Sequence, residues 1–329
     1  MSRLTFGVGL FPTDPLPKVV HLATLSESLG FSHAWVGDSH LIWREAYVNL
    51  TAAALATSKL VLGTGVTNVL TRDPSVVASA FSTLQEACPR RLILGVGLGD
   101  SAVETMGRKP ARLADFELAV RRMRELMNGS KVAIDTGTIH LKHGAPARVP
   151  IYFAASGPKM LDLAGRIADG VIILVGVDPP RVRQALGTIE AGARAAGRTL
   201  DDIDLVLWVP CAVADTGARD AVKAHVARVV AHPLPYTLAP DEQKVLDEIR
   251  RAYNYYQHME QQASQAMVVP DWLVDRFAVA GTPAEIRAGI DRLGDTGIKQ
   301  VAIIPYGAGG GDRETTLRGF AAAVMGVCR

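Results

Sequence analysis

The chain has 329 residues, of which 48% are hydrophobic and 21% are charged, a balance typical of a globular enzyme. Its formal net charge of +2 gives no electrostatic reason to expect a nucleic-acid or membrane partner. The three cysteines, Cys88, Cys211 and Cys328, are far apart and form no CxxC pair, so we expect neither a disulfide framework nor a bound metal, and a reducing cytoplasm fits best.

Apolar, strand-like runs alternate with amphipathic helical stretches from one end of the chain to the other. The N-terminal run lacks the apolar core of a signal peptide, and no later run is long enough to predict a membrane span. The expected strands cover residues 4–10, 32–37, 59–65, 91–97, 149–155, 170–175, 203–214 and 299–306. The helices expected after them cover residues 15–29, 45–57, 74–88, 112–128, 157–169, 179–196, 217–230 and 312–326.

Most of the strand-like runs are apolar throughout, which is typical of parallel strands buried on both faces. Eight strand–helix units in a chain of this length predict a TIM (β/α)8 barrel, with a doubly wound open sheet as the alternative. Two insertions interrupt the alternation of strands and helices: a small hairpin at 130–148 and a longer, helical, aromatic-rich segment at 232–280. We therefore expect a single barrel domain over residues 1–329.

After the second insertion, Thr282, Pro283 and Glu285 predict the start of a helix with a capping box.

The loop "GVGLGDSAVETMG" follows the fourth strand and resembles a nucleotide fingerprint at first sight. Its glycines, Gly95, Gly97 and Gly99, are spaced G-x-G-x-G, and Asp100 stands where the fingerprint requires a glycine. We interpret the loop instead as a barrel strand ending in small residues, where Gly97 and Gly99 make room for a flat ring. Asp100 would be a polar group near that ring or a cap that fixes the loop.

Polar residues follow three other expected strands. Asp38 and His40, in "WVGDSH", come directly after the second strand, and histidine can transfer a proton near neutral pH. The third strand ends in "GTGVTN", which would place backbone amides and short polar side chains at the barrel mouth. For both loops, ordinary solvated or turn residues are the alternative interpretation.

The stretch "YFAASGPKM" predicts a strand, a turn and a helix start. Ser156 is expected as the N-cap, and Gly157 and Pro158 begin the helix. Its free amides, the helix dipole and Lys159 would attract an anion such as a phosphate, with an ordinary capped helix as the alternative. No Ser-His-Asp order, HExxH or Walker motif occurs, so a cofactor is expected to carry the chemistry.

Together, "GFSHAWVGDSH", "LGTGVTNVLTRDPSVVASAFSTL", "RLILGVGLGDSAVETMG" and "PIYFAASGPKMLDLAGRIADGVI" resemble the luciferase-like flavin oxidoreductase superfamily. Within it the chain is most similar to the branch that uses the deazaflavin coenzyme F-420 (F420), typified by methylenetetrahydromethanopterin reductase. The resemblance implies a TIM barrel, a homodimer, and a non-proline cis peptide at Gly65–Val66 against the cofactor ring. The cofactor-binding positions that it implies are Gly65, Val66, Thr67, Asn68, Gly97, Gly99, Asp100, Ala155, Ser156, Gly157, Pro158, Lys159, Met160, Gly176 and Val177.

One departure concerns the reaction. Gly9 stands where, in our alignment, the methanopterin reductases carry a glutamate, so the resemblance does not extend to their particular reaction. We expect His40 to replace that acid in proton transfer, with Asp38 orienting it. Tyr256 and His258 are candidate substrate contacts, against the alternative of a packed aromatic helix.

These observations predict an oxidoreductase that transfers a hydride between reduced F420 and a small organic acceptor: an imine, a carbonyl or an alkene. An FMN-dependent monooxygenase of the same superfamily is the first alternative, since both cofactors carry a tricyclic ring and a phosphate. A non-catalytic flavin-binding protein is the second.

Overall fold

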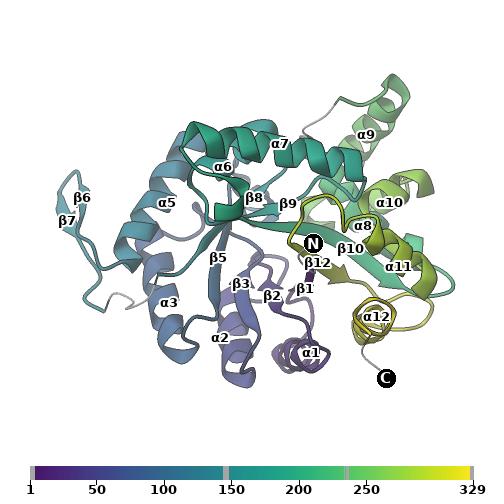
Figure 1. Ribbon diagram of the computed structural model, residues 1–329, viewed down its shortest axis with the longest axis horizontal. Helices are drawn as coiled ribbons and strands as arrows, with labels where there is room; N and C mark the ends of the chain where they lie inside the picture. The colour runs from purple at the N-terminus through teal and green to yellow at the C-terminus, as the bar shows by residue number, and fades with distance from the viewer. Residues whose placement is uncertain (1–3, 144–147, 233, 235–236, 327–329) are drawn as a thin grey trace. The chain divides into compact units, whose positions relative to one another are not determined.

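The computed structural model describes residues 4–143, 148–232, 234 and 237–326. Within these residues, eight strands form a closed ring of hydrogen-bonded neighbours in the order β10-β12-β1-β2-β3-β5-β8-β9, and β9 pairs again with β10 (Figure 1). This is the TIM barrel that the sequence predicts, and the ring closure excludes the open sheet. The ring strands are β1 (Thr5–Leu10), β2 (His33–Val36), β3 (Val61–Thr64), β5 (Leu92–Gly97), β8 (Ile151–Ala155), β9 (Gly170–Ile173), β10 (Asp204–Val213) and β12 (Gln300–Pro305).

Strands β5 and β12 are buried at every position, which explains why uninterrupted apolar runs marked the strands. Helices follow the ring strands close to the predicted bounds. They are α1 (Leu16–Ser28), α2 (Ala46–Ala56), α3 (Pro74–Ala87), α5 (Leu113–Met127), α6 (Pro158–Ile167), α7 (Pro179–Ala195), α8 (Ala218–Ala231) and α12 (Arg313–Phe320). The last of these continues as a π-helical turn over Ala321–Met325. No helix in the described part of the chain is long and apolar enough to cross a membrane.

The chain divides into two compact units. We call residues 10–27 and 32–154 the β2–β5 unit, and residues 1–9, 28–31 and 155–329 the β9–β12 unit. The expectation of a single domain stays a prediction.

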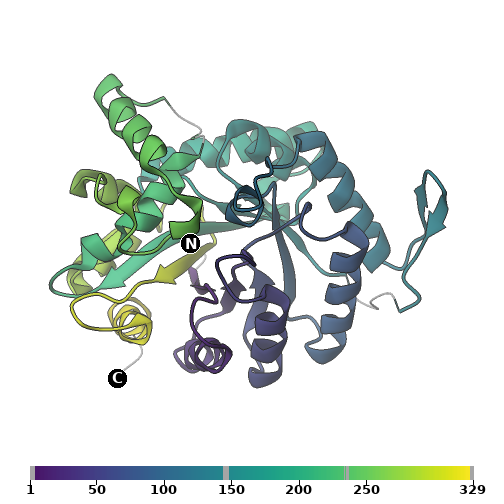
Figure 2. The same ribbon diagram turned by 180° about the vertical axis from the view of Figure 1, so that it is seen from behind.

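The β2–β5 unit carries the first insertion and two short elements that the sequence did not predict. The insertion is an antiparallel hairpin, β6 (Val132–Ile134) and β7 (Gly137–Ile139), which extends away from the helices of its unit (Figures 1 and 2). Part of the predicted hairpin segment, residues 144–147, lies outside the described residues. The unpredicted elements are the two-residue strand β4 (Thr67–Asn68), which pairs with β5, and the one-turn helix α4 (Ser101–Glu104).

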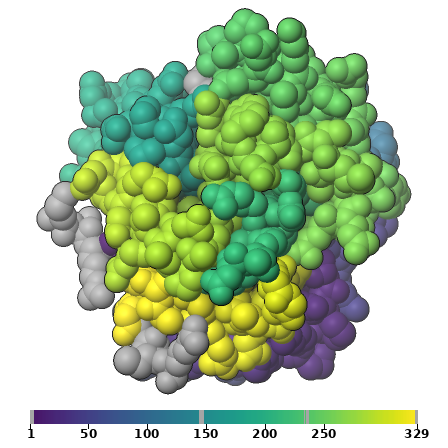
Figure 3. All heavy atoms as spheres, turned by 90° about the vertical axis from the view of Figure 1, so that its right-hand side faces the viewer, coloured from purple at the N-terminus to yellow at the C-terminus, as the bar shows by residue number. Residues whose placement is uncertain are grey.

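The β9–β12 unit contains the second insertion, whose elements gather on the face shown in Figure 3. The expected aromatic helix is not formed, because α9 (Pro240–Ala252) ends before it and Tyr255–Gln257 make a 3-10 turn. The insertion packs on α8 through Ala224, Ala263 and Ala266. The helix α10 (Asp271–Phe277) and the strand β11 (Val279–Gly281) follow.

The capping box predicted at the start of α11 (Pro283–Asp291) is confirmed. The amide of Thr282 donates to Glu285 Oε2 over 2.8 Å, and the amide of Glu285 donates to Thr282 Oγ1 over 3.4 Å. Each side chain thus satisfies one backbone donor that the first helical turn leaves without a partner.

Candidate active site

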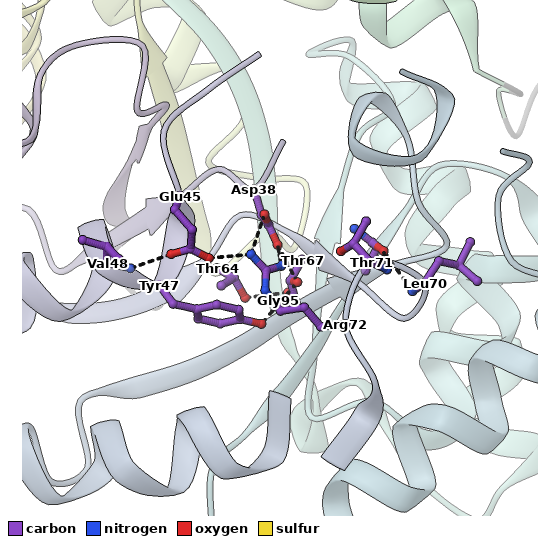
Figure 4. A network of polar contacts seen from close by, with 11 residues as sticks. Asp38, Glu45, Tyr47, Val48, Thr64, Thr67, Leu70, Thr71, Arg72 and Gly95 are labelled. Carbon is purple, nitrogen blue, oxygen red and sulfur yellow. Dashed lines mark hydrogen bonds and ion pairs between the residues drawn. The ribbon is translucent and has the colours of Figure 1, made fainter. Parts of the chain in front are cut away.

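In the β2–β5 unit, the loops after β2 and β3 bring a carboxylate, a hydroxyl and a guanidinium together (Figure 4). Asp38 lies two residues beyond β2, and Thr67 and Arg72 lie beyond β3. Asp38 and Thr67 are buried, with exposed fractions of 6% and 0%. Because the carboxyl ends of parallel barrel strands form the face that carries active sites, this cluster lies where catalysis is expected.

The buried carboxylate of Asp38 is satisfied from two directions. Thr67 Oγ1 donates to Asp38 Oδ2 over 2.7 Å, and Arg72 Nη1 donates to the same oxygen over 2.6 Å. Arg72 Nη2 binds Glu45 Oε1 at 2.5 Å, so the guanidinium joins two carboxylates. The charge of Asp38 raises the pKa of Arg72, although burial by itself would lower it.

Tyr47, on α2, lies against the same guanidinium. The Arg72 Cζ atom lies 4.4 Å from the centre of the Tyr47 ring, which is a cation–π contact. The Tyr47 hydroxyl donates to Thr67 Oγ1 over 3.3 Å. Burial raises the pKa of Tyr47 to about 12, so its hydroxyl keeps its proton at neutral pH.

The predicted pairing of Asp38 with His40 is not formed. The oxygens of Asp38 accept from Thr67 and Arg72, and His40 is exposed in the turn that follows. Arg72, Glu45 and Tyr47 were not among the predicted site residues. The arginine in "LTRDP" was the only sequence feature that could have indicated an ion pair here. Arg72 is 34 residues from Asp38, however, and no local pattern links the two.

The peptide bond between Gly65 and Val66 is cis, as the resemblance implies. The side chain of Val66 packs where Gly95 and Gly97 lack side chains. A Cβ added to Gly95 would lie 2.0 Å from the Thr64 carbonyl oxygen and 3.1 Å from Val66 Cγ1, and one added to Gly97 would lie 3.2 Å from Val66 Cγ2. Gly97 therefore makes room for Val66, and its expected place beside a flat ring stays a prediction.

Gly99 and Asp100 shape the loop after β5. Gly99 has a φ of +107°, and a Cβ there would lie 2.6 Å from Val103 Cγ2, so glycine is needed for α4 to start. Asp100 occupies the N-cap position of α4, but its side chain makes no capping hydrogen bond, which corrects its expected role as a cap. Ser101 helps to hold the loop, because its Oγ lies 2.7 Å from Ser39 Oγ, with both side chains buried.

In the β9–β12 unit, the predicted anion site lies at the start of α6. Gly157, and not Ser156, is the N-cap, and Pro158 takes the first helical position. No side chain caps the helix, because glycine has none. Lys159 is exposed in the first turn, whereas Ala155 and Met160 are buried. The helix start therefore presents its backbone amides and one ammonium group.

The loop after β9 is tied to the second insertion. Gly176 has a φ of +89°, and a Cβ there would lie 2.5 Å from the carbonyl oxygen of Arg276. The amide of Val177 donates to that same carbonyl over 2.8 Å.

The two candidate substrate contacts differ in exposure. Tyr256 is 61% exposed, whereas His258 is 3% exposed. His258 Nδ1 lies 2.6 Å from the Tyr253 hydroxyl, so this histidine packs inside the insertion.

The space that a side chain at Gly9 would occupy is filled by the side chains of Ile304 and Trp208. A Cβ on Gly9 would lie 3.0 Å from Ile304 Cγ1 and 3.2 Å from Trp208 Cη2. The buried Trp208 ring thus explains why this strand carries no larger residue there.

The residues 4–300 match the model of the luciferase-like monooxygenase family. The chain therefore belongs to this family.

Its relatives include 5,10-methylenetetrahydromethanopterin reductase from Methanolobus tindarius, 34% identical over 91% of this chain and 93% of that protein. F420-dependent glucose-6-phosphate dehydrogenase from Mycolicibacterium fortuitum is 34% identical over 64% of this chain and 69% of its own length. Among solved structures, the coenzyme F420-dependent tetrahydromethanopterin reductase from Methanopyrus kandleri is 27% identical, with a TM-score of 0.79 over 99% of both chains.

Proposed function

We propose that this protein is an oxidoreductase that transfers a hydride between reduced F420 and a small organic acceptor such as an imine, a carbonyl or an alkene. The observation that carries the proposal is the similarity, over nearly the whole chain, to reductases and to a solved F420-dependent enzyme. When bound, the deazaflavin would supply the hydride.

The residues present fit such a cofactor. In the β2–β5 unit, Val66 is half-buried and Thr67 and Asn68 are buried, and a flat ring would rest on their backbone and small side chains. Asn68 Oδ1 accepts from the amides of Leu70 and Thr71 at 2.9 Å each, which fixes this loop. In the β9–β12 unit, the first-turn amides of α6 and Lys159 suit a phosphate. Ser156, Gly157, Gly176 and Val177 stay proposed cofactor contacts.

The chain's own groups would position the reactants and move one proton. Asp38 accepts a hydrogen bond from Thr67 and is itself held by Arg72, and these contacts orient the loop after β3. His40 is the proposed proton donor, because its imidazole is exposed beyond β2.

The cofactor proposal is tested by titrating the purified protein with F420 and with FMN while absorbance and fluorescence are recorded. We expect saturable binding of F420 and no oxygen consumption. Tight binding of reduced FMN with oxygen-dependent hydroxylation, and no binding of F420, would establish the monooxygenase alternative that the family includes.

The role of His40 is tested by His40→Ala. We expect turnover to fall by about 100-fold or more with F420 affinity unchanged, since general acid catalysis contributes about 10²–10⁴-fold. His140→Ala, at an exposed hairpin histidine, is the control. Equal turnover in the two variants would remove His40 from the mechanism.

We further propose that the protein acts in the cytoplasm as a homodimer. Helix α2 contains no charged residue and exposes Val48 and Leu55, with exposed fractions of 56% and 71%. Val76, at the start of α3, is 54% exposed. Because a helix facing water normally carries polar residues, a second copy is the proposed cover for this apolar face. Cys88 and Cys211 are buried free thiols, which suits a reducing compartment.

A further inference from the structure

The loop after β9 is held from one side by the end of α10. The amide of Val177 donates to the carbonyl oxygen of Arg276 over 2.8 Å. A Cβ on Gly176 would lie 2.5 Å from the same oxygen and 3.0 Å from Phe277 Cδ1, so the loop and α10 are in direct contact. The conformation of this loop therefore depends on where the second insertion places the end of α10.

Glu242, on α9, connects α10 to the first turn of α7 (Figure 1). Arg276 Nη1 forms an ion pair with Glu242 Oε1, and Arg181 Nη2 lies 3.7 Å from Glu242 Oε2. The two oxygens of one carboxylate thus face two different guanidinium groups. Because α10 carries the carbonyl that binds the loop after β9, and α7 begins where this loop ends, Glu242 connects the elements on both sides of the loop.

The charges in this cluster balance. Arg181 Nε also lies 3.5 Å from Asp178 Oδ2, so two guanidinium groups share two carboxylates. The side chains of Arg181 and Glu242 are each 17% exposed, so solvent and salt screen their attraction less than at an open surface. The Arg276 Cζ atom lies 4.9 Å from the centre of the Trp272 ring, a cation–π contact that helps to orient the guanidinium. A neutral side chain at position 242 would leave two cations with one carboxylate, and their mutual repulsion would favour separation of α7 and α10.

We propose that Glu242 is a positioning residue for the proposed cofactor site. By binding Arg181 and Arg276, it holds the loop after β9 in the conformation in which Gly176 and Val177 contact the cofactor. It acts through α7 and α10 rather than by touching the cofactor. The inference rests on the proposed function, because Gly176 and Val177 are proposed cofactor contacts.

Glu242→Gln is the most informative variant. Glu242 Oε2 also accepts from the amide of Ala239 over 3.2 Å at the start of α9, and glutamine keeps an oxygen for this contact. The substitution therefore removes the charge and preserves the start of the helix. Glu190→Gln is the matched control, because it breaks an ion pair with Arg194 that lies within α7.

Hydrogen exchange of the full chain without cofactor, followed by mass spectrometry, reports on the loop itself. We expect peptides that cover residues 174–178 to exchange about tenfold faster in Glu242→Gln, and peptides from β12 to exchange at the parent rate, since the opening is local. Equally faster exchange in both segments would mean that Glu242 only stabilises the fold, and unchanged exchange of 174–178 would mean that it does not hold the loop. Either result would overturn the inference.

Fluorescence titration with F420 tests the consequence for binding. We expect the affinity to fall about tenfold in Glu242→Gln, through faster dissociation, and to be unchanged in Glu190→Gln. Arg276→Met should also weaken binding, and adding it to Glu242→Gln should change little, because the contact between the two residues is already broken. Parent-like affinity in Glu242→Gln, or fully additive losses, would overturn the inference. Absence of F420 binding by the parent protein contradicts the proposed function instead, and the exchange experiment still decides whether Glu242 holds the loop.

Discussion

Asp38 is a buried carboxylate whose charge is compensated by one guanidinium. Arg72→Met removes that compensation and leaves Asp38 buried at 6% exposure. Breaking a buried pair on one side costs about 3–5 kcal/mol, so we expect the free energy of unfolding in urea to fall by about that amount. Adding Asp38→Asn to Arg72→Met should restore part of the loss. A fall below about 1 kcal/mol would mean that water compensates the carboxylate instead.

Tyr47 makes stability depend on pH in the alkaline range. Its pKa is about 12 in the folded protein, whereas an unfolded tyrosine titrates near 10. The folded state therefore holds the proton more tightly. The stability that Tyr47 contributes is fully present below about pH 10 and is lost as the pH rises through about 12. We expect Tyr47→Phe to lose less stability than the parent over this range in urea unfolding. Parallel curves for the two proteins would contradict this assignment.

At the scale of the element, the start of α11 is set by a capping box, which involves only residues that are close in the sequence. Thr282→Ala removes the side chain that accepts from the Glu285 amide, and we expect a loss of about 1 kcal/mol in unfolding free energy. Thr83→Ala, on the exposed side of α3, is the control and should change stability by less than about 0.5 kcal/mol. Equal melting temperatures in the two variants would show that the capping box adds nothing.

The eight ring strands could be predicted because most of them lie in apolar runs, and β5 and β12 are buried at every position. The short elements could not, because their hydrogen bonds come from distant neighbours. Thr67 and Asn68 become β4 only by pairing with Val96 and Gly97. The N-cap at Ser156 was predicted wrongly because Pro158 sets the helix start one residue later.

At the scale of the whole molecule, the uncharged helix α2 predicts self-association. We expect sedimentation to give a dimer for the parent protein and a monomer for Leu55→Glu, because a buried unpaired charge opposes association. Leu118→Glu, at a residue of α5 that is 50% exposed, is the control and should stay dimeric. A monomeric parent, or the same mass for both variants, would contradict the proposed interface.

The sequence by itself determined the barrel, the two insertions, the capping box and the loops that carry the candidate site. These follow from local patterns: apolar runs, turn residues and caps act on neighbours along the chain. Only the tertiary structure decided that Asp38 pairs with Arg72 and Thr67, that Val66 fills the space over Gly95 and Gly97, and that Trp208 covers Gly9. Those contacts join residues of different strands and of the loops after them, and the pairing of the strands, rather than any local pattern, sets which side chains meet.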